Sequence, residues 1–197
     1  MPNEAQPSFS SQDRIIEAAV ALLMKDGLRA TTTRGVTELA GVSTGLLNHY
    51  FRWPELRALA WARIFEAVAL DQFPSHLHPK MALEHYFSTA FSGDAETFWR
   101  LWKEAADLAA TDELMRQAFG LAQTRLDEGL AGVLTAGCHA ACWHLADAKA
   151  TAVRLGALYD GLAGLLLSPH PPIDAAGAAA HLRKAFDLET RATTIET

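Results

Sequence analysis

The chain has 197 residues, of which 50% are hydrophobic, and a formal net charge of −6 at pH 7. A chain of this length and apolar content can bury one or two cores, which excludes a disordered protein, and the acidic balance argues against a uniformly basic nucleic-acid binder. No run of about 18 uncharged apolar residues is present and the N-terminus lacks the features of a signal peptide, so we expect a cytoplasmic protein without membrane contact.

Hydrophobic periodicity predicts helices along the whole chain, and strand-like alternation is absent. Serine and threonine caps mark the expected starts, and glycine and proline mark the ends. We therefore expect an all-α fold of about nine helices. Their predicted bounds are Ser11–Asp26, Thr33–Ala40, Ser43–Tyr50, Pro54–Gln72, Met81–Phe91, Ala95–Ala109, Asp112–Ala136, Asp147–Leu167 and Asp174–Leu188.

The second and third helices are short and a tight turn joins them, which is the layout of a helix-turn-helix. Gly41 permits this turn because glycine adopts left-handed backbone angles without strain. We expect the ring of Tyr50 to pack inward, together with the apolar side chains Val36, Leu39, Ala40, Val42, Leu47 and Phe51. The third helix then leaves a polar outer face for a DNA major groove. Residues 27–57 carry four arginines against two glutamates, so the one basic stretch coincides with this motif.

The stretch from Ile15 to Leu59 resembles the DNA-binding domain of the TetR family of repressors. The string AGVSTGLLNHYF at residues 40–51 is most similar to the choline-responsive BetI-type branch, and residues 80–188 resemble the BetI-type C-terminal domain more loosely. The resemblance implies a dimeric transcriptional regulator, a repressor that binds double-stranded operator DNA and is released from it by a small effector. It implies no cofactor, metal or catalytic residue, and the sequence shows no motif of an enzyme.

The matched positions predict which residues contact DNA. Hydroxyl and amide groups at the start of a helix favour a phosphate, Leu46 can contact a thymine methyl, and Asn48 and His49 can donate to phosphates or base edges. The predicted DNA-binding residues are Thr32, Thr33, Arg34, Ser43, Thr44, Gly45, Leu46, Asn48, His49, Tyr50 and Arg52. The family usually has a phosphate-binding lysine at the start of the fourth helix, where this chain has a shorter segment, and either Arg52 or Arg57 can substitute for it.

Aromatic residues gather in the second half of the chain. They can form an ordinary core, but aromatic faces also attract quaternary ammonium ions, each by about 0.5–2 kcal/mol. We therefore expect a pocket for a small effector, either cationic or uncharged and apolar, with Asp160, Asp107 or Glu104 as a counter-charge for a cation. The predicted ligand-binding residues are Tyr86, Phe98, Trp99, Trp102, Phe119, Gln123, Tyr159 and Asp160.

The last two long helices are the expected dimer interface, because their small and large apolar residues recur at three- and four-residue spacing. The alternative is that the glycines of the penultimate helix admit a neighbour within one subunit. The predicted interface residues are Leu155, Leu158, Leu162, Ala178, His181, Leu182 and Ala185.

The expected domains are an N-terminal arm at 1–10, the helix-turn-helix domain at 11–56, the effector and dimerisation domain at 57–190 and a C-terminal tail at 191–197. We expect Pro74 and Pro79 to end the structural unit that contains the fourth helix. Two alternatives stay open. Cys138, His139, Cys142 and His144 can make the chain a metal- or thiol-redox-responsive regulator, and the missing lysine can mean a helical interaction module without DNA binding.

Overall fold

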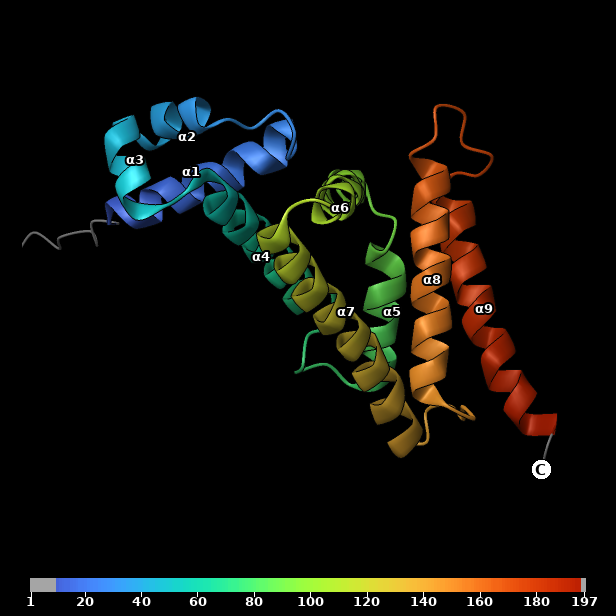
Figure 1. The fold of residues 1–197 in the computed structure, drawn as a ribbon. Coiled ribbons are helices and arrows are strands. Elements are labelled where there is room, and N and C mark those ends of the chain that lie inside the picture. Colours follow the sequence, from blue (N-terminus) through green and yellow to red (C-terminus); the bar gives the residue numbers. More distant parts are fainter. Residues whose placement is uncertain (1–9, 196–197) are drawn as a thin grey trace, which may run out of the picture. The chain divides into compact units, whose positions relative to one another are not determined.

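The computed structural model of the chain describes residues 10–195, and side chains within 10–190. In this part the chain forms nine helices and no strand, which confirms the predicted all-α class (Figure 1). The helices are α1 (Ser11–Asp26), α2 (Thr33–Ala40), α3 (Thr44–Tyr50), α4 (Trp53–Gln72), α5 (Pro79–Thr89), α6 (Ala95–Ala109), α7 (Glu113–His139), α8 (Ala148–Leu166) and α9 (Ala175–Ile195). The predicted arm at 1–10 lies outside the described residues except for Ser10.

Several helix ends differ from the predicted bounds, most clearly the start of α5 and the ends of α7 and α9. Pro79 opens α5 instead of ending the preceding unit, because proline fits the first helical turn, where its missing N–H is not needed. The α7 helix continues through Gly137 to His139, and the ring of Trp143 occupies the space that a Cβ at Gly137 would need. The α9 helix runs to Ile195, through most of the predicted tail, and residues 196–197 lie outside the described part.

The chain divides into two compact units that do not follow the chain order. Unit 1 runs through Phe65 and includes Leu101–Phe119, and unit 2 comprises Glu66–Arg100 and the chain from Gly120 onward. Three helices, α4, α6 and α7, therefore each contribute residues to both units.

In unit 1, helices α1, α2 and α3 pack around a small apolar core. The fully buried side chains of this core are Ile15, Ala19, Leu23, Val36 and Leu47. The prediction for α2 was wrong at one position, because Leu39 is 56% exposed and Thr37 is 6% exposed. The inner face of α2 is thus rotated toward Thr37, whose hydroxyl donates to the carbonyl of Arg34 at 2.9 Å and is not left unpaired. The ring of Tyr50, expected inside, is 40% exposed.

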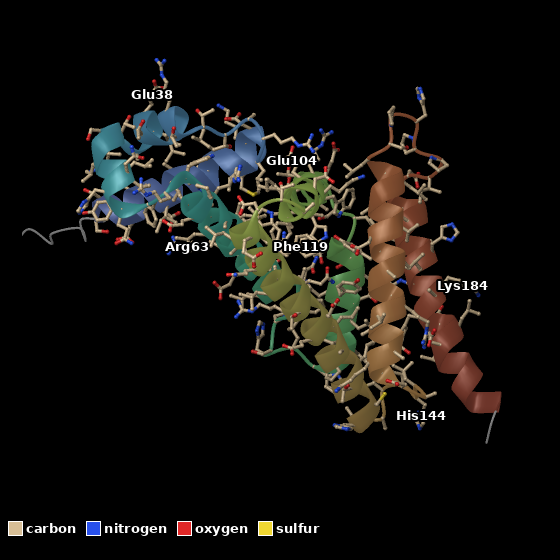
Figure 2. The ribbon with its side chains drawn as sticks, viewed as in Figure 1. Glu38, Arg63, Glu104, Phe119, His144 and Lys184 are labelled. Atoms are coloured by element: carbon tan, nitrogen blue, oxygen red, sulfur yellow. The ribbon has the colours of Figure 1, made fainter. Side chains whose placement is uncertain are left out.

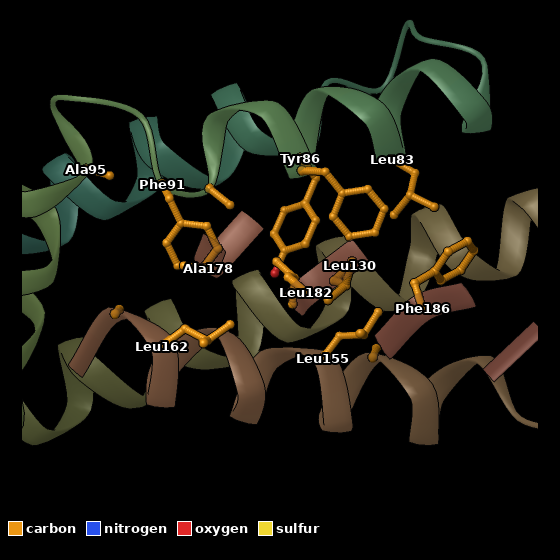
Figure 3. Packing of buried hydrophobic residues seen from close by; sticks show 14 of the residues in the cluster. Leu83, Tyr86, Phe91, Ala95, Leu130, Leu155, Leu162, Ala178, Leu182 and Phe186 are labelled. Carbon is orange, nitrogen blue, oxygen red and sulfur yellow. The ribbon is translucent and has the colours of Figure 1, made fainter. Parts of the chain in front are cut away.

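In unit 2, α8 and α9 lie side by side, and α5 packs against α9 (Figure 1). Leucines of α8 and α9 share one apolar cluster with aromatic side chains of α5 and of the segment after it, and Figure 3 shows Tyr86, Phe91, Leu155 and Leu182 of this cluster. These side chains belong to one continuous apolar cluster to which α6 and α7 also contribute.

Candidate nucleic-acid interface and effector site

The α3 helix presents most of its residues to solvent. Ser43 caps it by accepting a hydrogen bond from the backbone N–H of Leu46 at 3.1 Å, and Leu47 is its fully buried anchor. Among the predicted DNA-binding residues on α3, Leu46 is half-buried and the others are exposed, namely Thr44, Gly45, Asn48, His49 and Tyr50. The outer face of α3 is therefore free to meet another molecule.

The start of α2 carries the second predicted group. The hydroxyl of Thr32 accepts from the N–H of Gly35 at 3.2 Å, so it acts as the N-cap. The Arg34 guanidinium donates to Glu38 at 2.8 Å on the surface, and this hydrogen bond and the negative charge of Glu38 raise the pKa of Arg34 (Figure 2). A phosphate at this position would replace Glu38 as the partner of Arg34.

The two arginines that could replace the family's lysine have different environments. Arg57 forms an ion pair with Asp112 at 2.7 Å, with only 18% and 14% of the two side chains exposed. Arg52 is exposed, and its guanidinium forms no ion pair with any described residue, whereas its backbone N–H donates to Glu55 at 2.9 Å. Arg52 is thus the arginine that remains available to a phosphate.

Two carboxylates proposed as counter-charges for an effector have other partners in unit 1. Glu104 accepts a hydrogen bond from the backbone N–H of Leu28 at 2.6 Å, and Asp107 pairs with Arg29 at 2.7 Å. Figure 2 shows Glu104 on α6. Both side chains therefore have partners in the connection between α1 and α2, and their role at an effector stays a prediction.

The structure separates the predicted ligand-binding residues into two aromatic clusters. Trp102 and Phe119 belong to unit 1, with their ring centroids 4.4 Å apart, and both contact Trp61. Tyr86, Trp99 and Tyr159 belong to unit 2. The combination of both sets in one pocket stays a prediction.

The unit 2 cluster, which we call the aromatic cage, consists of the rings of Phe73, Tyr86, Phe91, Trp99 and Tyr159. Neighbouring ring centroids lie between 5.4 and 6.3 Å apart. Sequence reasoning did not assign Phe73 or Phe91 to the ligand site, because aromatic residues at helical spacing give no signal that separates a site from a core.

Polar groups lie beside the aromatic cage. The indole N–H of Trp99 donates to the Tyr159 hydroxyl at 2.8 Å, and a hydrogen bond joins Tyr159 to Gln72. Burial raises the pKa of Tyr159, with a further contribution from the charge of Asp160, so the phenol is neutral. Burial is also the main reason why the pKa of Tyr86 is raised, and the negative charge of Asp160 contributes.

Two acidic side chains accompany these phenols. Burial raises the pKa of Asp160, and the negative charge of Asp127 raises it further. Gln123, predicted as a ligand-binding residue, donates to the Asp127 carboxylate at 3.0 Å. Unit 2 therefore contains aromatic faces together with two carboxylates that repel each other, and a bound cation would relieve that repulsion.

The predicted dimer residues are placed unequally. Four of the seven lie in the core of their own subunit, each at most 6% exposed, namely Leu155, Leu162, Ala178 and Leu182. Leu158 and Ala185 pack partly against this core, and His181 is exposed. The outer face of α8 and α9 consists of other residues, among them Val153 at 66% exposure and Leu188 at 55%.

The remaining candidate residues are the two cysteines and Phe98. Cys138 and Cys142 are free and half-buried, and no group of three or more His, Cys, Asp or Glu side chains within the described part is arranged to hold a metal ion. Phe98 is half-buried on α6. No helix in the described part is long and apolar enough to cross a membrane.

Two protein families match the sequence. The family of bacterial regulatory proteins described as the tetR family matches residues 15–52, and the C-terminal family of BetI-type transcriptional repressors matches residues 79–190. No curated protein sequence matches the chain.

Solved structures of transcriptional regulators share the fold. A TetR-family regulator from Rhodococcus sp. has a TM-score of 0.74 and 22% identity, over 91% of this chain and 98% of that one. A regulator from Saccharomonospora viridis, solved in complex with choline, has a TM-score of 0.70 and 17% identity, over 88% and 94%. A regulator from Pseudomonas aeruginosa PAO1 has a TM-score of 0.71 and 22% identity, over 93% and 91%. At these identities the likeness shows the fold.

Proposed function

The chain belongs to the TetR family of bacterial regulatory proteins, with a BetI-type C-terminal region, and from this premise we propose that it is a dimeric repressor released from its operator by a small organic cation. The observation that carries the DNA-binding half is the exposed outer face of α3, held by one buried anchor, Leu47, and a capped N-terminus. Because its target is chromosomal DNA, we also propose that it acts in the cytoplasm.

The proposed DNA interface is the predicted set on α2, α3 and the start of α4, with Arg52 as the replacement for the missing lysine. A salt-dependent gel shift with the DNA upstream of its own gene tests this set. Arg52→Gln should lower the affinity and the salt slope, whereas Arg57→Gln should act mainly on stability, because Arg57 already pairs with Asp112. If the wild-type protein does not bind this DNA at low salt, that result would favour the helical interaction module without DNA binding.

The proposed dimer interface stays on α8 and α9 but uses their outer face. Val153, Leu165 and Leu188 are large apolar side chains that are at least 43% exposed there, and Ala157 and Gly161 leave room for a close neighbour. To enter successive major grooves on one face of B-DNA, the two α3 helices of a symmetric pair must lie about 34 Å apart. Sedimentation of Val153→Arg should show a weakened dimer, and an unchanged mass would contradict this face.

The proposed effector site is the aromatic cage with Asp160 and Asp127. Aromatic faces and nearby carboxylates are the chemistry that recognises quaternary ammonium groups, and the choline complex of the Saccharomonospora viridis regulator supports the same ligand class for this chain. The rings contact one another, so binding requires them to separate. A ligand that binds better to the separated arrangement shifts the population away from the DNA-binding state by its differential affinity.

Calorimetric titration distinguishes charge from shape. Choline should bind, and its uncharged isostere 3,3-dimethylbutan-1-ol should bind at least about tenfold more weakly, because it lacks the charge interaction. Asp160→Asn should remove most of this preference, and Leu70→Asn, at a 67% exposed position of α4, serves as the control. Since the pKa of Asp160 is raised, choline affinity should increase with pH until this carboxylate is fully ionised. Equal binding of the two ligands would contradict the cationic class.

A further inference from the structure

The turn between α2 and α3 is held by a side chain from α1. The Nε of Arg14 donates to the carbonyl of Ala40 at 3.1 Å, and its Nη2 donates to the carbonyl of Gly41 at 3.0 Å and also to that of Ala40. Sequence reasoning missed this residue because it lies 26 positions before Ala40. A single guanidinium thus binds two successive carbonyls across the turn.

Those two carbonyls define the direction in which the chain leaves α2. Gly41 adopts the left-handed conformation, with φ 63° and ψ 42°, and its peptide orientations determine where α3 begins. Other groups satisfy two earlier carbonyls of α2, since the N–H of Gly41 donates to Glu38 and the N–H of Val42 donates to Thr37. Arg14 adds partners for the carbonyls of Ala40 and Gly41 at this helix end, where a positive charge is also favoured by the helix dipole.

The orientation of α3 depends strongly on this turn, because little else fixes it. Among the seven residues of α3, one side chain is buried, that of Leu47. Phe51, directly after the helix, is 9% exposed and provides a second apolar anchor at the far end. With few buried side chains to hold α3, the peptide orientations of the turn contribute to its rotation, and hydrogen bonds to base edges tolerate little rotation.

Arginine is suited to this role in a way that lysine is not. Its planar guanidinium has five N–H donors in a fixed arrangement and can bind two acceptors at once, whereas an ammonium group is a flexible point charge. Arg14 forms no ion pair with a described carboxylate, so its charge is directed to the carbonyls of the turn. Glu17, which lies on α1 as Arg14 does, instead forms a surface ion pair with Arg63 of α4 at 2.7 Å.

We propose that Arg14 is a positioning residue for operator recognition, which sets the rotation of α3 through the carbonyls of Ala40 and Gly41 and makes no essential contact with a DNA phosphate. The proposal rests on the proposed DNA-binding function. It requires that loss of Arg14 lowers the discrimination between the operator and other DNA, while the electrostatic part of DNA binding remains.

The test compares Arg14→Met with Arg14→Lys and with the control Arg63→Met. Each protein is titrated with the upstream duplex that the wild type protects and with a scrambled duplex of equal length, at four salt concentrations. Arg14→Met should lower the ratio of operator affinity to scrambled affinity by about tenfold or more, as expected when a base contact is misplaced. Its salt slope should equal that of the wild type, and Arg63→Met should keep both quantities.

Three results would overturn the proposal. A salt slope that falls by about 0.9 in both Arg14 variants would show a direct phosphate contact instead. An unchanged affinity ratio in Arg14→Met would show that the turn does not need the side chain. Full recovery of the ratio by Arg14→Lys would show that charge alone suffices. If Arg14→Met does not fold, Arg14→Lys carries the test and should show an intermediate ratio.

A readout without DNA separates this proposal from the proposed function. Amide hydrogen exchange at Gly41 and Val42 should be faster in Arg14→Lys than in the wild type, while exchange in α9 stays the same. Faster exchange in a protein that binds no operator would contradict the proposed function and leave the turn assignment supported. Unchanged exchange at both amides would contradict the assignment itself.

Discussion

Units 1 and 2 both contain contacts between aromatic rings, but they differ in how far along the chain their hydrogen bonds between side chain and backbone reach. In unit 1, side chains bind the backbone of distant segments, as Arg14 binds Ala40 and Gly41, Glu104 binds Leu28, and the Trp61 indole donates to the carbonyl of Leu101 at 3.2 Å. In unit 2, aromatic rings pack with apolar side chains of five helices, and hydrogen bonds between side chain and backbone join nearer segments, as between His85 and the carbonyl of Asp71.

The difference matches two demands on the protein. Reading base edges needs a backbone with a fixed path, because hydrogen-bond geometry tolerates little displacement. Admitting an effector needs side chains that can rearrange while the backbone is retained. Contacts from a side chain to distant backbone provide the first property, and packed rings provide the second, because rings change rotamer more easily than a capped turn changes its peptide orientations.

The largest expected effect tests the apolar character of unit 2. Leu155 is 1% exposed, so Leu155→Ala should lower the free energy of unfolding by about 2–5 kcal/mol through lost burial and a cavity. Val153→Ala, on the exposed side of the same helix, should change unfolding little and mainly weaken the dimer. Urea unfolding at several protein concentrations separates the two effects. If Leu155→Ala changed only the dimer, Leu155 would be an interface residue and the assignment to the core would fail.

The second effect tests the polar contacts of unit 1. Asp112→Asn leaves Arg57 largely buried without its charged partner and should cost about 3 kcal/mol at pH 7. Burial acts to raise the pKa of Asp112, but the N–H of Met115 and the Arg57 guanidinium outweigh it and lower the pKa. The stabilisation is therefore present above the ordinary aspartate pKa of about 3.9 and is lost as the pH falls below it.

Unfolding measured from pH 7 to pH 3 checks this dependence. The wild type should lose more stability than Asp112→Asn over the acidic part of the range. Arg63→Gln removes an exposed ion pair and should cost about 0–1 kcal/mol. Equal losses for the buried and exposed pairs would show that burial does not matter here.

The third effect concerns the caps of the DNA-reading helices. Ser43→Ala removes the acceptor for the N–H of Leu46 and should cost about 1 kcal/mol in thermal or urea unfolding. Ser43→Asn keeps an acceptor at the cap and should stay within a few tenths of a kcal/mol of the wild type. A loss as large for asparagine as for alanine would show that the hydroxyl serves another purpose.

The smallest effect is expected at the end of α7. Ala141 has φ 51°, where glycine is favoured, and the N–H of Cys142 donates to the carbonyl of Gly137 across this turn at 2.8 Å. Ala141→Gly should therefore raise the free energy of unfolding by about 0.5–1 kcal/mol. Ala136→Gly, inside the helix, should lower it by about 1 kcal/mol. A loss in both variants would contradict the strain at Ala141.

The sequence by itself determined the helical class, the order of the nine helices and the family. These features depend on short-range signals, namely apolar periodicity, the caps Thr32 and Ser43, and the left-handed Gly41, all of which act within a few residues. Helix ends were less predictable, as α7 shows, since it continues past Gly137, where the ring of Trp143 lies against the glycine.

Only the tertiary structure decided which side of a helix is buried and which partners a charge has. Leu39 and Thr37 exchange the places that hydrophobicity predicts, and Leu155 and Leu182 turn out to lie in the subunit core. Periodicity predicts that a helix has an apolar stripe. Whether that stripe packs in a core, in an interface or against a ligand depends on residues that are far apart in the chain. For the same reason the partners of Arg14, Arg57 and Glu104 could not be predicted. The type of a side chain does not indicate which distant backbone group or carboxylate it binds.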